Sequence, residues 1–256
     1  MPAPAAGPRG VTASASVVLA PNPGPMTLDG TNTWILRAPD SQACVVVDPG
    51  PLDEGHLASV AGCGPVATIL LTHGHYDHSE GATRLAELTR APVRALDPAH
   101  RLGDEGLGEG DVIAAAGLEI RVAATPGHSS DSLSFVLGGP GGDAAVLTGD
   151  TILGRGTTVV AHPDGVLADY LASLRRLREL GDVVVLPGHG PELTSAGVVA
   201  EQYLAHREQR LEQVRAAVAA GATTAREVVE IVYADVDRAL WPAATMSVLA
   251  QLEYLR

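Results

Sequence analysis

Three histidines and one aspartate fall within six consecutive positions, in the run His73-Gly74-His75-Tyr76-Asp77-His78. The apolar residues just before this run predict a buried strand over 67–72. Strand ends are rigid, and the loops that leave them can gather several side chains around one point. Imidazole and carboxylate ligands together suit zinc, and also iron or manganese. The run therefore indicates a metal site, in preference to a polar turn that carries histidines by accident.

Three further predicted strands end in the same way. His128 follows a strand and the turn Thr125-Pro126-Gly127, and His189 follows a strand and the turn Pro187-Gly188. Asp150 follows a strand and a single glycine. Each of these residues alone would more often belong to an ordinary loop. Four strand ends that each deliver His or Asp are best explained by one shared metal site.

Composition limits the cellular compartment and the binding partners that we expect for the protein. The 256 residues suffice for one large domain, or for one domain with a small appendage, and 46% are hydrophobic and 18% charged, as in globular proteins. The net charge of −13, in which every basic residue is Arg, disfavours broad binding of nucleic acid, although a metal centre could still hold one phosphate. Two cysteines, no signal peptide and no apolar run of about 18 residues predict a cytoplasmic protein without a membrane segment.

Hydrophobic periodicity predicts a mixed α/β catalytic domain over residues 15–194, after a loose Pro/Ala/Gly-rich leader over 1–14. From residue 195 to 256 the pattern becomes helix after helix, and Thr224 with Glu227 is a capping-box signal. Strands are expected at 15–20, 33–37, 44–48, 67–72, 118–124, 133–137, 144–148 and 183–186, and helices at 82–89, 166–180, 196–219, 225–233 and 242–255.

The motif His-x-His-x-Asp-His, followed by isolated His, Asp and His, resembles the metallo-β-lactamase superfamily over nearly the whole chain. The resemblance implies an αββα sandwich (α/β, or α+β) with the site at one edge between two sheets. It also implies that His73, His75 and His128 hold one metal ion. Asp77, His78 and His189 would hold a second ion, and Asp150 would bridge the two.

This ligand set implies a hydrolytic mechanism. Two divalent ions about 3.5–4 Å apart can share a hydroxide, because metal binding lowers the pKa of water toward roughly 7. The hydroxide would attack a carbonyl carbon or a phosphorus atom, with Asp77 and Asp150 as the catalytic carboxylates. Zn²⁺ is the expected ion, with Fe or Mn as alternatives. The Asp150 bridge argues against lactam hydrolysis as the main activity.

Three further segments, at 22–33, 149–158 and 203–210, are similar to the β-lactamase-like protein 2 branch of the superfamily. Its animal member is a single-strand endoribonuclease, and related fungal members are thioesterases that release polyketides from acyl carrier protein. The branch carries a small C-terminal winged-helix-like domain, which matches the helices expected after residue 195. The resemblance favours a small thioester or ester substrate of the glyoxalase II or acyl-thioesterase kind, with single-stranded RNA as the alternative and a β-lactamase or a non-catalytic metal protein as weaker ones.

Residues outside the metal ligands are expected in two groups. Candidates for substrate contact flank the ligands in sequence and are Tyr76, Ser129, Arg155, Thr157 and Thr158. His206 and Arg207 lie on a polar helix and are expected at the solvated surface. His56, His100 and His162 have no supporting context and are also expected at the surface, with a position near the site as the alternative for His162.

Overall fold

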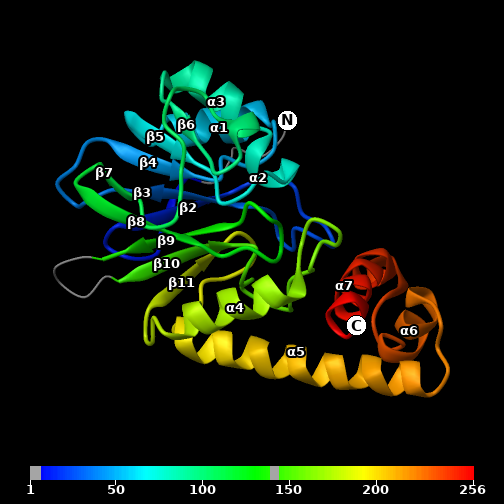
Figure 1. The fold of residues 1–256 in the computed structure, drawn as a ribbon. Helices are drawn as coiled ribbons and strands as arrows, with labels where there is room; N and C mark the ends of the chain where they lie inside the picture. The colour runs from blue at the N-terminus through cyan, green and yellow to red at the C-terminus, as the bar shows by residue number, and fades with distance from the viewer. Residues whose placement is uncertain (1–6, 139–143) are drawn as a thin grey trace.

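The computed structural model describes residues 7–138 and 144–256, and its strands form two sheets packed face to face (Figure 1). The first sheet has the order β1 (Arg9–Gly10), β2 (Ala15–Leu19), β3 (Asn32–Leu36), β4 (Cys44–Val47), β5 (Val66–Leu70) and β6 (Val93–Arg94). The second has the order β11 (Val184–Pro187), β10 (Ala145–Gly149), β9 (Leu133–Leu137), β8 (Leu118–Ala124) and β7 (Val112–Ala115). Parallel pairing joins β4 to β5, β5 to β6 and β10 to β11, and the other neighbours are antiparallel.

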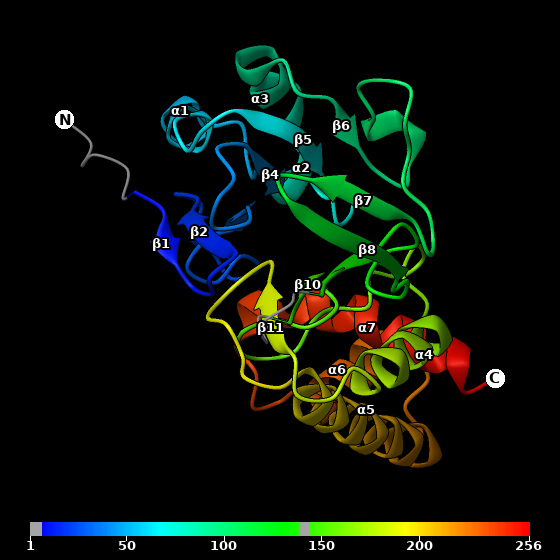
Figure 2. The same cartoon turned by 90° about the vertical axis from the view of Figure 1, so that its left-hand side faces the viewer.

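Both faces of each sheet are covered, so every residue of the central strands β3, β4 and β10 is buried. In β3, Trp34 and Leu36 point into the core between the sheets, whereas Ile35 points outward to the helices. Helices α1 (Glu54–Ala61) and α3 (Ala82–Thr89) cover the first sheet, and α4 (Leu167–Arg178) covers the second (Figures 1 and 2). The expected αββα sandwich is confirmed.

Three helices form the C-terminal part of the molecule: α5 (Ala196–Ala219), α6 (Ala225–Val232) and α7 (Trp241–Tyr254). The first half of α5 packs on α4 through Ala200 and Leu204, while its second half packs on α6 and α7 through Val214 and Ala217. A helix shared between two cores fixes the C-terminal helices at one end of the sandwich (Figure 1). The domain boundary at 195 stays a prediction, since α5 belongs to both cores.

The sequence located all eight expected strands to within two residues, and α3 and α5 match their expected bounds. The capping box of Thr224 and Glu227 is confirmed at the start of α6. Short elements were missed: β1, β6, β7, α1 and the four-residue helix α2 (Tyr76–Ser79). For β1 and β6 the reason is physical, because a strand of two residues has no periodicity to detect.

Strand β1 lies in the segment expected to be a loose leader. Arg9 and Gly10 pair with Val17 and Ser16 at the sheet edge, and the Arg9 guanidinium donates to Glu192. Residues 7–14 are thus partly paired with the sheet, and residues 1–6 lie outside the described part. Among the described residues, no helix is long and apolar enough to cross a membrane.

Candidate metal centre

The seven predicted ligands come from loops at one edge of the sandwich. His73 and His75 follow β5, and His75 precedes α2, which carries Asp77 and His78. His128 lies between β8 and β9, and Asp150 and His189 follow β10 and β11. The structure brings all seven side chains together, in three overlapping groups of possible ligand atoms within 4.8 Å of one another.

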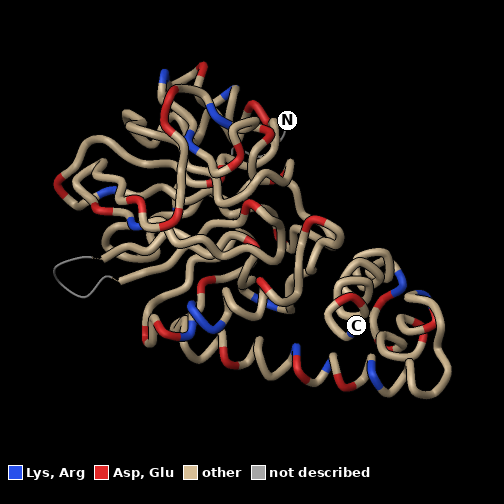
Figure 3. The backbone as a smooth tube through the Cα atoms, in the orientation of Figure 1, with Lys and Arg blue, Asp and Glu red and all other residues tan. Residues whose placement is uncertain are grey.

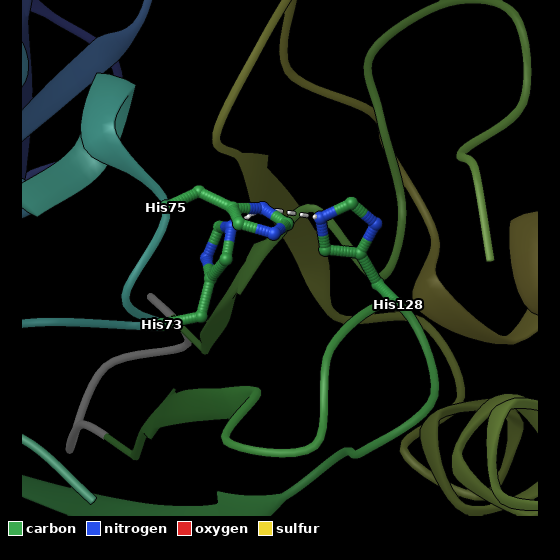
Figure 4. A group of neighbouring side chains, drawn as sticks. All are labelled: His73, His75 and His128. Carbon is green, nitrogen blue, oxygen red and sulfur yellow. Dashed lines mark hydrogen bonds between the residues drawn. The ribbon is translucent and has the colours of Figure 1, made fainter. Parts of the chain in front are cut away.

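One group consists of three imidazoles and lies on one side of the cluster. Nδ1 of His75 lies 2.9 Å from Nε2 of His73 and 3.0 Å from Nε2 of His128. Figure 4 shows the three rings turned toward one another, with His73 and His75 on one loop and His128 on another. Three imidazoles facing one point are a donor set that suits Zn²⁺.

A second group lies beside the first and contains one carboxylate. Nε2 of His189 is 3.1 Å from Oδ2 of Asp77 and 3.2 Å from Nε2 of His78. Nε2 of His78 is 3.6 Å from the same Asp77 oxygen. Asp77, His78 and His189 thus offer a second set of one oxygen and two nitrogens.

Asp150 reaches both groups. Its Oδ1 lies 3.3 Å from Nε2 of His78 and 3.4 Å from Nε2 of His189, while its Oδ2 lies 3.7 Å from Nε2 of His128. Oδ1 is buried and accepts no hydrogen bond. A buried carboxylate oxygen without a donor is costly, and a cation would satisfy it. The residues therefore fit a divalent metal ion, and Asp150 lies between the two groups of possible ligands.

The outer nitrogens of three rings are held by acceptors. Nδ1 of His128 lies 2.7 Å from the Val159 carbonyl oxygen, and Nδ1 of His189 lies 3.2 Å from that of Gly30. Nδ1 of His78 lies 2.9 Å from Oδ2 of Asp48. Because carbonyl and carboxylate oxygens only accept, each Nδ1 donates, and Nε2 is the nitrogen directed at the cluster.

Electrostatics divide the cluster into two halves. Burial lowers the pKa of His73 well below its usual range and lowers that of His128, so both rings are neutral ligands at pH 7. Burial opposes charge on Asp150, but the nearby His189 and His78 hold its pKa well below the usual range. Burial also lowers the pKa of His189, yet Asp150 and Asp77 outweigh it and raise the value to about 9. A metal ion on that side must displace a proton, so its binding weakens as pH falls.

Asp48 is a functional residue that the sequence analysis missed. It follows β4 directly, and its side chain accepts from Thr72 N (2.8 Å) and Thr72 Oγ1 (2.7 Å) as well as from His78. Its φ of 52° lies in the left-handed region, which Asp tolerates better than most residues. An apolar strand ending in a carboxylate is the same signal that identified Asp150, and it could have identified Asp48.

The predicted substrate contacts lie in different environments, and their roles stay predictions. Thr157 and Thr158 line a cavity beside the cluster, where Thr158 Oγ1 is 3.2 Å from Nδ1 of His128. Ser129 is buried and donates to Asp131. Tyr76 is 82% exposed, and Arg155 forms an exposed ion pair with Asp29 away from that cavity.

The cavity beside the cluster has a volume of about 190 Å³ and extends from His128 and Asp150 to the C-terminal helices. Arg207 on α5 lines it and is buried, with 3% exposure, where a solvated residue was expected. Its guanidinium donates to the Thr158 carbonyl and lies 5.0 Å from the centre of the Tyr170 ring. The expectation failed because the polar pattern of α5 does not show that the loop after β10 covers this face.

An αββα sandwich with His and Asp side chains gathered at one edge defines a class of metal-dependent hydrolases, and comparison with known proteins agrees. Residues 26–189 match the Metallo-beta-lactamase superfamily, and residues 224–256 match the Beta-lactamase associated winged helix domain. The chain is 30% identical to the Beta-lactamase-like protein 2 homolog of Drosophila melanogaster, over 96% of this chain and 88% of that protein. It is 32% identical to the Atrochrysone carboxyl ACP thioesterase of Aspergillus fumigatus, over 84% of this chain and 72% of that protein.

The solved structures agree with the sequence relatives. A beta-lactamase domain protein from Burkholderia ambifaria superposes with a TM-score of 0.81 at 25% identity, covering 100% of this chain and 89% of its own. A metallo-beta-lactamase family protein from Thermus thermophilus has a TM-score of 0.78 at 24% identity, over 95% and 93% of the two chains, and shows the same fold. The chain belongs to the metallo-beta-lactamase superfamily and is a metal-dependent hydrolase. The expected winged-helix-like domain is confirmed over residues 224–256, which contain α6 and α7.

Proposed function

We propose that this protein hydrolyses small thioester or ester substrates at a dinuclear centre, with zinc as the metal. His73, His75 and His128 would hold one ion, Asp77, His78 and His189 the other, and Asp150 would bridge them. Two such ions would supply a hydroxide nucleophile at neutral pH and polarise the substrate oxygen.

The chain's own residues support this chemistry by fixing the donor atoms. The acceptors on His78, His128 and His189 keep each Nδ1 protonated and hold each ring in place, so the Nε2 atoms already face the cluster before a cation binds. Thr158 lies against His128 in the wall of the cavity, where it would contact a bound substrate.

The chemistry of the cavity is the observation that supports a small thioester or ester as the substrate. Its walls beside His128 and Asp150 are mostly apolar and come from the N-terminal loop, the loop after β10 and the C-terminal helices; they include Met26, Leu28, Leu153, Val236, Leu240 and Ala243. Apolar walls with a few polar groups are typical of sites for small organic ligands. A fungal relative is named as a thioesterase, which supports the same substrate class.

Single-stranded RNA is the alternative, and the charge distribution opposes it. Figure 3 shows basic positions interspersed with acidic positions along the described chain. RNA binding relies on several phosphate contacts, and a net charge of −13 makes each approach of a polyanion less favourable.

The test combines metal analysis with a panel of substrates. Purified protein is assayed with acyl-CoA, S-lactoylglutathione, a lactone, a phosphodiester and single-stranded RNA, each at low and high salt. We expect two ions per chain and thioester or ester turnover that changes little with salt, whereas RNA cleavage would fall steeply.

A pair of histidine variants provides the control. His75→Ala removes one donor of the cluster and should lower turnover by orders of magnitude together with the metal content. His162→Ala removes a histidine that pairs with Glu253 outside the cluster and should leave both unchanged. Full thioester turnover with fewer than two ions per chain would contradict the dinuclear proposal, and salt-sensitive RNA cleavage as the main activity would contradict the substrate class.

A further inference from the structure

The cavity beside the metal centre is also lined by basic side chains. These are Arg207 and Arg210 of α5, with His206 next to Arg207 in the sequence and with Tyr233 just after α6. Arg207 lies on the side of the metal ligands, since it donates to the Thr158 carbonyl, whereas Arg210 is held at the C-terminal helices by the Val232 carbonyl. Asp150 is the single carboxylate among the residues that line the cavity, so its wall at Arg210 is basic in a protein whose net charge is −13.

Neither arginine is neutralised within the described part of the chain. Arg207 and Arg210 form no ion pair there, whereas Arg215, one turn further along α5, pairs with Glu212. In a chain with 30 acidic and 17 basic residues, carboxylates are abundant partners for arginine. Arg207 is buried and donates to the Thr158 carbonyl, which leaves Arg210 as the arginine available to an anion from outside.

Arg210 is held in place and still has free donors. Its Nη1 donates to the Val232 carbonyl at 2.7 Å and to Oε1 of Gln213 at 3.0 Å, and its guanidinium lies 4.6 Å from the centre of the Tyr233 ring. An arginine has five N–H donors, and within the described chain Nε and Nη2 of Arg210 have no hydrogen-bond partner. A fixed guanidinium with unused donors loses little side-chain entropy when it binds an anion.

His206 adds a polar group beside the arginine. Burial, followed by the positive charges of Arg207 and Arg210, lowers the pKa of His206. Its ring is consequently neutral at pH 7, so the charge that attracts an anion comes from the arginines.

We propose that Arg210, with His206 beside it, forms an anion subsite that binds a carboxylate or phosphate group of the substrate while the apolar part of the substrate lies along Leu28, Leu153 and Leu240. The proposal rests on the proposed function, because it gives the small substrate a negative charge at a distance from the bond that is cleaved. The anion has two chemical sources: a carboxylate on the acyl chain, or a phosphate on the thiol leaving group.

Two pairs of thioesters separate these sources. In the first pair, the N-acetylcysteamine thioester of glutaric acid is compared with its methyl ester, which lacks the charge. In the second pair, butyryl phosphopantetheine is compared with butyryl pantetheine. We expect the metal-loaded protein to prefer the charged member of one pair through a lower KM.

Substitutions on one helix assign the preference to Arg210. Arg210→Gln should lower kcat/KM for the charged member by about 10- to 100-fold, the loss expected for a charge-assisted hydrogen bond, and should leave the neutral member unchanged. Arg210→Lys should retain part of the preference. Arg215→Gln is the matched control, since Arg215 lies outside this cavity, and it should change neither member.

A binding measurement keeps the subsite distinct from the catalytic proposal. Calorimetry with glutarate, its monomethyl ester and phosphopantetheine reports affinity even if no thioester is hydrolysed. Weaker binding of the more highly charged ligand to Arg210→Gln supports the subsite in either case. Equal turnover and binding of charged and neutral members by the wild-type protein, or an equal loss for both members in Arg210→Gln, would overturn it.

Discussion

Replacing Asp48 by Asn tests how the chain directs a histidine at the metal centre. Asp48 is 1% exposed, and its two oxygens accept from Thr72 N, Thr72 Oγ1 and His78 Nδ1. Asn keeps the size of the side chain and tolerates the positive φ at this position, so the fold should be retained. The change replaces one acceptor oxygen by a donor NH₂ group next to Nδ1 of His78.

The expected effect follows from the tautomer of His78. An NH₂ group cannot accept from Nδ1–H, so the ring favours the tautomer with its proton on Nε2, the nitrogen that faces Asp150 and His189. That proton occupies the lone pair needed by a metal ion. Loss of such an outer partner typically costs 10- to 100-fold in metal affinity, which corresponds to about 1.4–2.7 kcal/mol. The His73, His75 and His128 group is expected to keep its ion.

The assay is metal content per chain after dialysis against a series of chelator concentrations. Asp48→Asn should lose one ion at about 10- to 100-fold lower chelator strength than the wild type and keep the other. Asp40→Asn, an exposed residue in a loop, is the matched control and should behave as the wild type. Retention of both ions with unchanged affinity would refute the reasoning, as would simultaneous loss of both ions in a protein that still unfolds at the wild-type temperature.

Three further changes test other parts of the structure. Gly188→Ala would place a Cβ 2.7 Å from both Asp150 Oδ1 and His78 Cε1, so kcat/KM should fall by about a hundredfold in a folded protein. A wild-type kcat/KM would contradict the close contact between Gly188 and these two side chains. Burial lowers the pKa of His56, so the unfolded state binds more protons, and the free energy of unfolding should drop as pH falls below about 6.5. In denaturant titrations at several pH values, His56→Gln should remove part of this pH dependence. An unchanged pH dependence would contradict the role given to His56. Thr224→Ala removes the cap of α6 and should cost about 1 kcal/mol in unfolding free energy without changing metal content, which loss of metal would contradict.

The sequence predicted the parts of the fold that local chemistry determines. Apolar runs are recognisable because a strand covered on both faces needs an apolar side chain at nearly every position, as in β4. The metal cluster was predictable for a related reason, since its residues follow strand ends directly and their types suit a cation. Residues at short or edge elements, such as Arg9 in β1, carry no such pattern.

Burial of single polar residues was not predictable. His56 was expected at the surface, yet it is 2% exposed, and its Nε2 lies 2.8 Å from Thr33 Oγ1. Arg207 lies on a helix with polar neighbours and is buried by the loop after β10, which is far away in sequence. In both cases the environment depends on which distant segment covers the residue, and periodicity within one element does not contain that information.

By itself the sequence determined which residues could bind metal, and it determined most of the strands and helices that present them. The tertiary structure decided which of those residues meet, because strand order and the packing of two sheets bring β5, β10 and β11 to one edge. It also decided the shape and charge of the substrate cavity, whose walls come from the N-terminal loop, the loop after β10 and the C-terminal helices. Ligand chemistry is local to a few residues, whereas a cavity exists only after distant surfaces have packed.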